Sequence, residues 1–178
     1  MVRVLAGALK GKVFRYPKYR IRPTTESTRA AIFNMIGDSI IQARAADFFC
    51  GAGALGIEAL SRGARSVWFF EKSIPAIKFL RKNLEGLNNV KIIRCDVLKQ
   101  INKIKGIEFD IILADPPYLK GLVNPFLARI VQAKILSKQG LVILQHHKKE
   151  EIELPETYYF HQQKRYGDTM ISIIKEVK

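Results

Sequence analysis

Residues 115–118, Asp115-Pro116-Pro117-Tyr118, could perform chemistry on an amine. Prolines fix the backbone and donate no amide hydrogen, so the Asp115 carboxylate and a carbonyl at Pro116 can accept both hydrogens of a planar amine. The nitrogen lone pair can then turn toward an electrophilic methyl group, while Tyr118 offers a flat face for an unpaired base. The alternative, a rigid turn after a strand, explains the prolines but not the aspartate and tyrosine together. The segment therefore favours methyl transfer to an exocyclic amine.

A glycine-rich turn provides a second candidate site. Gly51, Gly53 and Gly56 form the pattern G-x-G-x-x-G, which is typical of dinucleotide binding when the glycines follow an apolar strand directly. Here Asp47 lies inside the preceding strand, where its carboxylate would repel a pyrophosphate. An acid in this position favours a ligand with a cationic amine, such as the amino-acid part of S-adenosylmethionine.

Two more acids close the next predicted strands. In an open α/β sheet, ligands bind beyond the carboxyl ends of the strands. Glu71 lies 24 residues after Asp47, a reach that suits a carboxylate holding both hydroxyls of a ribose. Asp96 could accept a hydrogen bond from an adenine amino group, or it could simply cap a helix. We predict that Asp47, Glu71, Asp96 and Asp115 meet at one edge of a sheet.

Alternating strands and helices must position these acids. The pattern predicts strands over 45–49, 67–70, 90–93, 109–114 and 141–144, a final hairpin over 158–161 and 170–174, and helices over 54–62 and 126–136. A further helix is predicted after Ser73 as its cap, and another after Thr24 or Thr25, with Ile32, Phe33, Ile36 and Ile40 on its apolar face. Such βα repeats indicate a mostly parallel sheet with helices on both faces and an antiparallel edge.

The N-terminal residues form a basic segment. Short strands within 2–5 and 12–16 predict a β-hairpin outside the main sheet, which divides the chain into an extension over 1–24 and a domain over 25–178. The cations up to Arg29 are Arg3, Lys10, Lys12, Arg15, Lys18, Arg20, Arg22 and Arg29 itself, and they are interleaved with Phe14, Tyr16 and Tyr19. Because cations contact phosphates and exposed rings stack on bases, we predict an RNA-docking arm. The alternative is a hairpin whose aromatic rings pack on the core.

Composition limits the class of protein. The 178 residues are 48% hydrophobic, which suits one α/β domain, and the net charge of +14 indicates a polyanionic partner such as nucleic acid. With no long apolar run or cleavable leader in the sequence, we expect a cytoplasmic protein that does not contact membranes. The two cysteines, Cys50 and Cys95, lack C-x-x-C spacing and accompany three histidines, so we expect reduced thiols and no metal site.

These motifs together resemble a known family. The glycine motif, Glu71 and residues 115–118 resemble Rossmann-like S-adenosylmethionine-dependent methyltransferases that modify exocyclic amines. Arg22-Pro23-Thr24-Thr25, with Arg29, Ala30, Phe33 and Asn34, and Arg165-Tyr166-Gly167-Asp168-Thr169 narrow the resemblance to the RsmD-type enzymes, which make N2-methylguanosine in 16S ribosomal RNA. The resemblance implies a seven-stranded sheet, S-adenosylmethionine as cofactor, and a monomer that acts on an assembled small ribosomal subunit.

The resemblance also implies roles for individual residues. Asp47, Gly51, Gly53 and Gly56 would approach the methionine part of the cofactor, Glu71 its ribose and Asp96 its adenine, with Arg22 and Thr24 bordering the pocket. Asp115, Pro116 and Tyr118 would hold the target base, and Arg15, Lys18, Arg20, Arg165 and Tyr166 would contact RNA. The sequence differs from the usual family pattern at three positions: Phe48, Cys50 and Ala52 stand where Leu, Ala and Ser are more usual. Gln145 stands where the family pattern has an acid.

Three other functions fit parts of the pattern. An adenine-N6 methyltransferase on RNA or DNA would share residues 115–118, although this chain has no room for a separate recognition domain. An NAD-dependent oxidoreductase would use the glycines but leave Asp47 and residues 115–118 without a role. A non-catalytic RNA-binding protein would account for the charge but not for the intact Asp115 and Tyr118.

Overall fold

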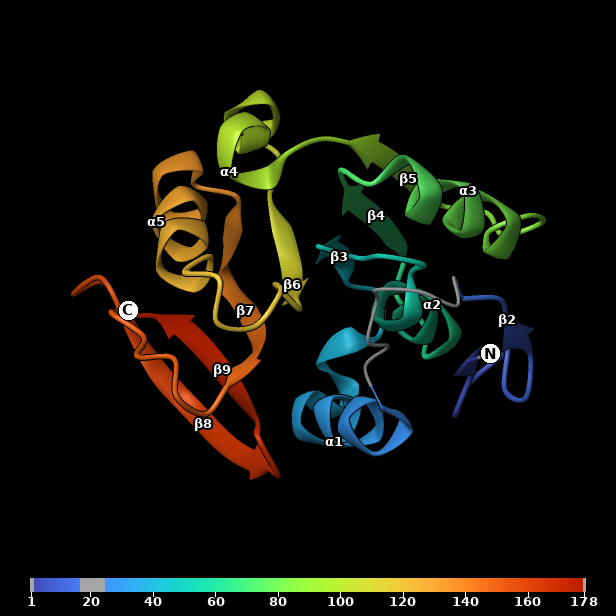
Figure 1. The fold of residues 1–178 in the computed structure, drawn as a ribbon, viewed down its shortest axis with the longest axis horizontal. Coiled ribbons are helices and arrows are strands. Elements are labelled where there is room, and N and C mark those ends of the chain that lie inside the picture. Colours follow the sequence, from blue (N-terminus) through green and yellow to red (C-terminus); the bar gives the residue numbers. More distant parts are fainter. Residues whose placement is uncertain (1, 17–24, 178) are drawn as a thin grey trace.

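The computed structural model describes residues 2–16 and 25–177, and a twisted seven-stranded sheet forms its centre (Figure 1). The strand order is β5-β4-β3-β6-β7-β9-β8. The strands are β3 (Arg44–Phe48), β4 (Ser66–Glu71), β5 (Val90–Arg94), β6 (Phe109–Ala114), β7 (Leu136–His147), β8 (Tyr158–Tyr166) and β9 (Thr169–Glu176). Strands β3 to β7 pair in parallel, whereas β9 is antiparallel to both β7 and β8. The predicted fold class is confirmed, with the antiparallel strand one position inside the edge strand β8.

Within residues 2–16 and 25–177, five α-helices connect or flank these strands. They are α1 (Glu26–Ile36), α2 (Ala54–Ser61), α3 (Ile74–Asn83), α4 (Val97–Gln100) and α5 (Val123–Ala133), with short 3-10 turns at Gly37–Ile40 and Ile101–Ile104. The predicted caps are present, because the side chain of Thr25 accepts from the amide of Thr28 and that of Ser73 from the amide of Ala76. Gly37 ends α1, so Ile40 is buried from the following turn rather than from the helix.

The central strands are buried on both faces. Odd-numbered residues such as Ala45 and Leu113 pack with α1, α2 and α3, whereas even-numbered residues such as Ala46 and Ala114 pack with α4 and α5. This alternation follows from the period of two along a strand. Strands covered on both faces are expected to be apolar throughout, so a polar side chain on them, such as Asp47, requires a local reason.

Several boundaries differ from the prediction, most of all in the C-terminal half of the chain. The helix expected over 126–136 begins at Val123 and ends at Ala133, because Lys134 adopts a left-handed conformation with φ of 51°. Leu136 already belongs to β7, where it pairs with Phe109 of β6. The final hairpin is longer than expected, since β8 continues to Tyr166 through polar residues that pair with β9. Backbone pairing extends these strands beyond their hydrophobic pattern.

The N-terminal hairpin is confirmed, but its aromatic residues are placed differently. Strands β1 (Val2–Arg3) and β2 (Val13–Phe14) form a separate antiparallel pair beside α2 (Figure 1). Phe14 is buried in the core with Val4, so the prediction that its ring is exposed for stacking is wrong. The predicted positions Lys18, Tyr19, Arg20, Arg22 and Thr24, and the boundary at 24, lie outside the described residues.

Arg29 was predicted to be one of the cations of the RNA-docking arm, but its side chain is buried. It is 1% exposed, its Nε lies 3.3 Å from the Glu58 carboxylate, and its Nη2 donates to the carbonyl of Arg3. Glu58 in turn accepts from the amides of Leu5 and Ala6. The pair therefore anchors the hairpin to α1 and α2.

No helix in the described parts of the chain is long and apolar enough to cross a membrane.

Candidate active site

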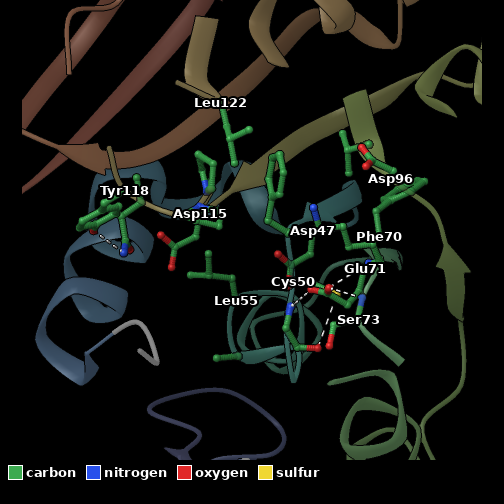
Figure 2. Close-up of a pocket in the computed structure, with 18 of the residues that line it drawn as sticks. Asp47, Cys50, Leu55, Phe70, Glu71, Ser73, Asp96, Asp115, Tyr118 and Leu122 are labelled. Atoms are coloured by element: carbon green, nitrogen blue, oxygen red, sulfur yellow. Dashed lines mark hydrogen bonds between the residues drawn. The ribbon is translucent and has the colours of Figure 1, made fainter. Parts of the chain in front are cut away.

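A cavity of about 590 Å³ opens at the carboxyl ends of the central strands. It lies at the position where the strand order reverses between β3 and β6, which is the usual ligand site of an open α/β sheet. Figure 2 shows Asp115 and Tyr118 at one end of the cavity and Asp96 at the other, with Asp47 and Glu71 between them. The fold thus brings together all four acids that the sequence placed at strand ends.

The three glycines of the turn have different surroundings. Gly51 lines the cavity. A Cβ atom on Gly53 would lie 2.6 Å from Leu80 Cδ1, and one on Gly56 would lie 2.3 Å from Phe69 Cε1. Gly53 also has a φ of 89°, a left-handed conformation that favours glycine. Gly53 and Gly56 therefore allow α2 to pack closely on β4 and α3, while Gly51 faces the cavity.

Asp47 is a buried carboxyl group between the sheet and α2. It is 1% exposed, and its Oδ2 accepts from the amide of Gly56 at 2.8 Å. Burial raises its pKa to about 8; the carboxylates of Asp115 and Glu71 contribute to this increase, while the Gly56 amide opposes it. The local reason for an acid inside this apolar strand is the Gly56 amide near the start of α2, from which the carboxyl group accepts.

We predict that Asp47→Asn stabilises the ligand-free protein more at pH 8.5 than at pH 5. Because folding raises the pKa of Asp47 from 3.8 to about 8, its contribution to stability is present below pH 4 and is lost as the pH rises to 8. The free energy of unfolding falls by at most about 1.4 kcal/mol per pH unit over this range. An asparagine at this position can still accept from the Gly56 amide. Thermal unfolding across pH 5–9 measures the difference. Exposed Asp38→Asn is the control, and a pH-independent difference would contradict the prediction.

Backbone amides hold Glu71 in place. Its Oε2 accepts from Gly51 at 2.9 Å, and its Oε1 accepts from Lys72 at 2.9 Å and from Ser73 at 2.7 Å. The carboxylate therefore connects the glycine turn to the start of α3 and keeps lone pairs for a ligand. Asp96 lies before α4 and lines the cavity; its side chain makes no capping hydrogen bond within the described chain, so the capping alternative fails.

Residues 115–118 follow directly from β6. The Asp115 amide is 3.5 Å from the carbonyl of Phe48, and Pro116 is buried. The Tyr118 hydroxyl accepts from Gln145 Nε2 at 2.9 Å and lies 2.9 Å from Thr169 Oγ1. Side chains from β7 and β9 thereby fix the tyrosine at the edge of the cavity.

Sequence reasoning did not predict that Tyr16, Thr28, Gln145 and Thr169 line the cavity. Asn83 positions Tyr16, because it accepts from the amide of Arg15 at 3.1 Å and donates to the carbonyls of Arg15 and Ala52 at 3.0 Å. Burial raises the pKa of Tyr16, and so do the nearby Asp47 and Asp115 carboxylates. The pattern of charge around Tyr16 suggested an RNA-docking arm and gave no signal for a cavity wall.

The two C-terminal residues expected to contact RNA lie at the β8–β9 turn. Arg165 is exposed, and its Nε donates to the carbonyl of Gly167 at 2.8 Å. Tyr166 packs against the core, and Lys164 Nζ lies 5.5 Å from the centre of its ring. Cys50 and Cys95 are free, and the described residues contain no cluster of His, Cys, Asp and Glu that could hold a metal.

Comparison with known proteins gives matches along nearly the whole chain. The model of the family "Conserved hypothetical protein 95" matches residues 2–175. A putative rRNA methyltransferase of Bacillus subtilis is 33% identical and covers 98% of this chain and 99% of its own. Ribosomal RNA small subunit methyltransferase D of Buchnera aphidicola is 32% identical and covers 92% of this chain and 87% of its own.

Solved structures agree with these matches. A putative methyltransferase from Escherichia coli superposes with a TM-score of 0.89 at 26% identity, covering 98% of this chain and 97% of its own. A putative methylase from Haemophilus influenzae gives a TM-score of 0.85 at 25% identity and covers 99% of both chains. The similarity therefore includes the hairpin, the sheet and the cavity rather than one motif.

Proposed function

Because the chain belongs to the family of RsmD-type methyltransferases, we propose that it transfers a methyl group from S-adenosylmethionine to the N2 amine of a guanine in 16S ribosomal RNA. The observation that carries this proposal is that residues 115–118 share one cavity with Asp47 and Glu71. An acceptor site for an amine thus adjoins the residues suited to a cationic cofactor.

The side chains that line the cavity suit the functional groups of S-adenosylmethionine. Buried Asp47, whose pKa is raised in the ligand-free protein, suits the ammonium group of the methionine part. Glu71 suits the ribose hydroxyls, because the surrounding amides fix its carboxylate. Asp96, at the far end of the cavity, suits the adenine amino group. When bound, the cofactor supplies an electrophilic methyl group.

Asp115 and Tyr118 would orient the target base. The Asp115 carboxylate accepts a hydrogen of the amine and favours the positive charge that grows on its nitrogen during transfer. The Tyr118 ring, which Gln145 and Thr169 hold by its hydroxyl, stacks on the extruded base. Catalysis is then mainly orientation and electrostatic stabilisation. An NAD-dependent reaction would give Asp115 and Tyr118 no role.

Methyl-labelled S-adenosylmethionine tests this function. The protein is incubated with unmodified small ribosomal subunits, naked 16S RNA or duplex DNA, and each substrate is digested to nucleosides. Label in N2-methylguanosine is expected, and a higher yield from particles would support recognition of the assembled subunit. Label in N6-methyladenine would instead identify the adenine enzyme. Tight binding of NADH but not S-adenosylhomocysteine in calorimetry would favour an oxidoreductase.

We also predict that the hairpin docks RNA. Lys10, Lys12 and Arg15 are exposed on it, so changing all three to Glu should weaken RNA binding. The slope of log affinity against log salt should fall by about 0.7 for each RNA phosphate that the variant no longer neutralises. Filter binding at several salt concentrations measures both quantities. Lys105, Lys134 and Lys138, which are exposed near the starts of β6 and β7 and outside the hairpin, provide a matched triple reversal as control. An equal loss of affinity in both variants would point to net charge alone.

A further inference from the structure

The side-chain oxygen of Gln145 is a buried hydrogen-bond acceptor that has no donor within the described residues. Gln145 lies in β7, is 5% exposed and lines the cavity. Its Nε2 donates to the Tyr118 hydroxyl, but its Oε1 has no hydrogen-bond partner among the described residues. Buried oxygen atoms are nearly always hydrogen-bonded in native proteins, so this atom suits a donor that arrives with a ligand.

The strand register places this acceptor beside Asp115. Ala114 of β6 pairs with Leu144 of β7, so the next residues, Asp115 and Gln145, lie side by side. Neighbouring strands are about 4.8 Å apart, which is close enough for two side chains to contact one base. Gln145 is odd-numbered, like Ile143, and therefore faces the layer of α1 and α2. Both side chains line the cavity. Gln145 contacts Tyr118 there, and Figure 2 shows Asp115 and Tyr118 at the same end.

We propose that Gln145 determines base specificity by accepting a hydrogen bond from the ring N1–H of guanine. The inference rests on the proposed methyl transfer to N2. In guanine, N1–H is adjacent to the N2 amine, so a base whose amine contacts Asp115 can present N1–H to the neighbouring Oε1. Adenine carries no hydrogen on N1, and its lone pair would face the Gln145 oxygen. The paired acceptors thus favour guanine and disfavour adenine.

A double-mutant cycle separates this role from that of holding Tyr118. The variants are Gln145→Met, Tyr118→Phe and the combination, and kcat/KM is measured with labelled cofactor on small ribosomal subunits. Tyr118→Phe removes the hydroxyl that Gln145 contacts and leaves Oε1 in place. If Oε1 binds the base, Gln145→Met lowers kcat/KM by roughly tenfold to a hundredfold, in the Tyr118→Phe background as well.

Two further measurements keep the result interpretable. S-adenosylhomocysteine should bind all variants with affinity within a few-fold of the parent, which shows that the cavity has folded. Gln145→Glu retains an acceptor and should keep most of the activity that Gln145→Met loses. If Gln145→Met adds no loss to Tyr118→Phe, or if Gln145→Glu is as impaired as Gln145→Met, the inference is overturned.

The identity of the methylated nucleoside distinguishes a failure of this inference from a failure of the proposed function on which it rests. N2-methylguanosine without an independent Gln145 effect would overturn only the role of Gln145. N6-methyladenine as the product would overturn both, because adenine offers no N1–H. N2-methylguanosine together with an independent loss in the Tyr118→Phe background is the result we expect.

Discussion

Asp115→Ala is expected to lower kcat for methyl transfer by about a thousandfold while S-adenosylhomocysteine still binds. Asp115 follows β6 at the end of the cavity that also holds Tyr118, away from Asp96 at the opposite end (Figure 2). Its carboxylate would act on the amine rather than on the cofactor. The change should therefore remove orientation and charge stabilisation in the transition state and leave ground-state binding of the cofactor intact.

Single-turnover kinetics with labelled cofactor and calorimetry with S-adenosylhomocysteine measure the two quantities. Exposed Asp38→Ala removes a carboxylate outside the cavity and should behave like the parent protein. Unchanged turnover in Asp115→Ala would remove this residue from the mechanism. Loss of S-adenosylhomocysteine binding would instead show that Asp115 supports the cofactor site.

Glu71→Gln should have the opposite kinetic signature. The carboxylate accepts from Gly51, Lys72 and Ser73, whereas a glutamine must turn its amide group toward at least one of these donors. The glycine turn loses its anchor, and the ribose loses a charged acceptor. Affinity for S-adenosylhomocysteine should fall by about a hundredfold. KM for the cofactor should rise, and kcat at saturation should change little.

Calorimetry and initial rates over a range of cofactor concentrations test this expectation. Exposed Glu85→Gln, in the same part of the chain, serves as the matched control. A fall in kcat with unchanged KM would place Glu71 in the transition state rather than in cofactor binding. Opposite signatures for Asp115 and Glu71 would divide the cavity into an amine end and a cofactor region.

Local sequence patterns predicted most of the fold. Short hydrophobic runs located every strand of the sheet. Thr25 and Ser73 were recognisable as caps because capping depends on neighbouring residues. The βα alternation then determined a parallel sheet, and with it the edge at which Asp47, Glu71, Asp96 and Asp115 lie. Errors occurred where pairing between distant segments decided the outcome, as at Leu136 and in the polar half of β8.

The sequence by itself therefore determined the succession of strands and the acids of the cavity, but not the short helix α4. Only the tertiary structure decided that Phe14 is in the core while Tyr16 lines the cavity, that Arg29 pairs with Glu58, and that Gln145 contacts Tyr118. The physical reason is that each of these outcomes depends on contacts between residues far apart in the chain. Periodicity and spacing describe one segment at a time, whereas burial and hydrogen bonding depend on how segments pack together.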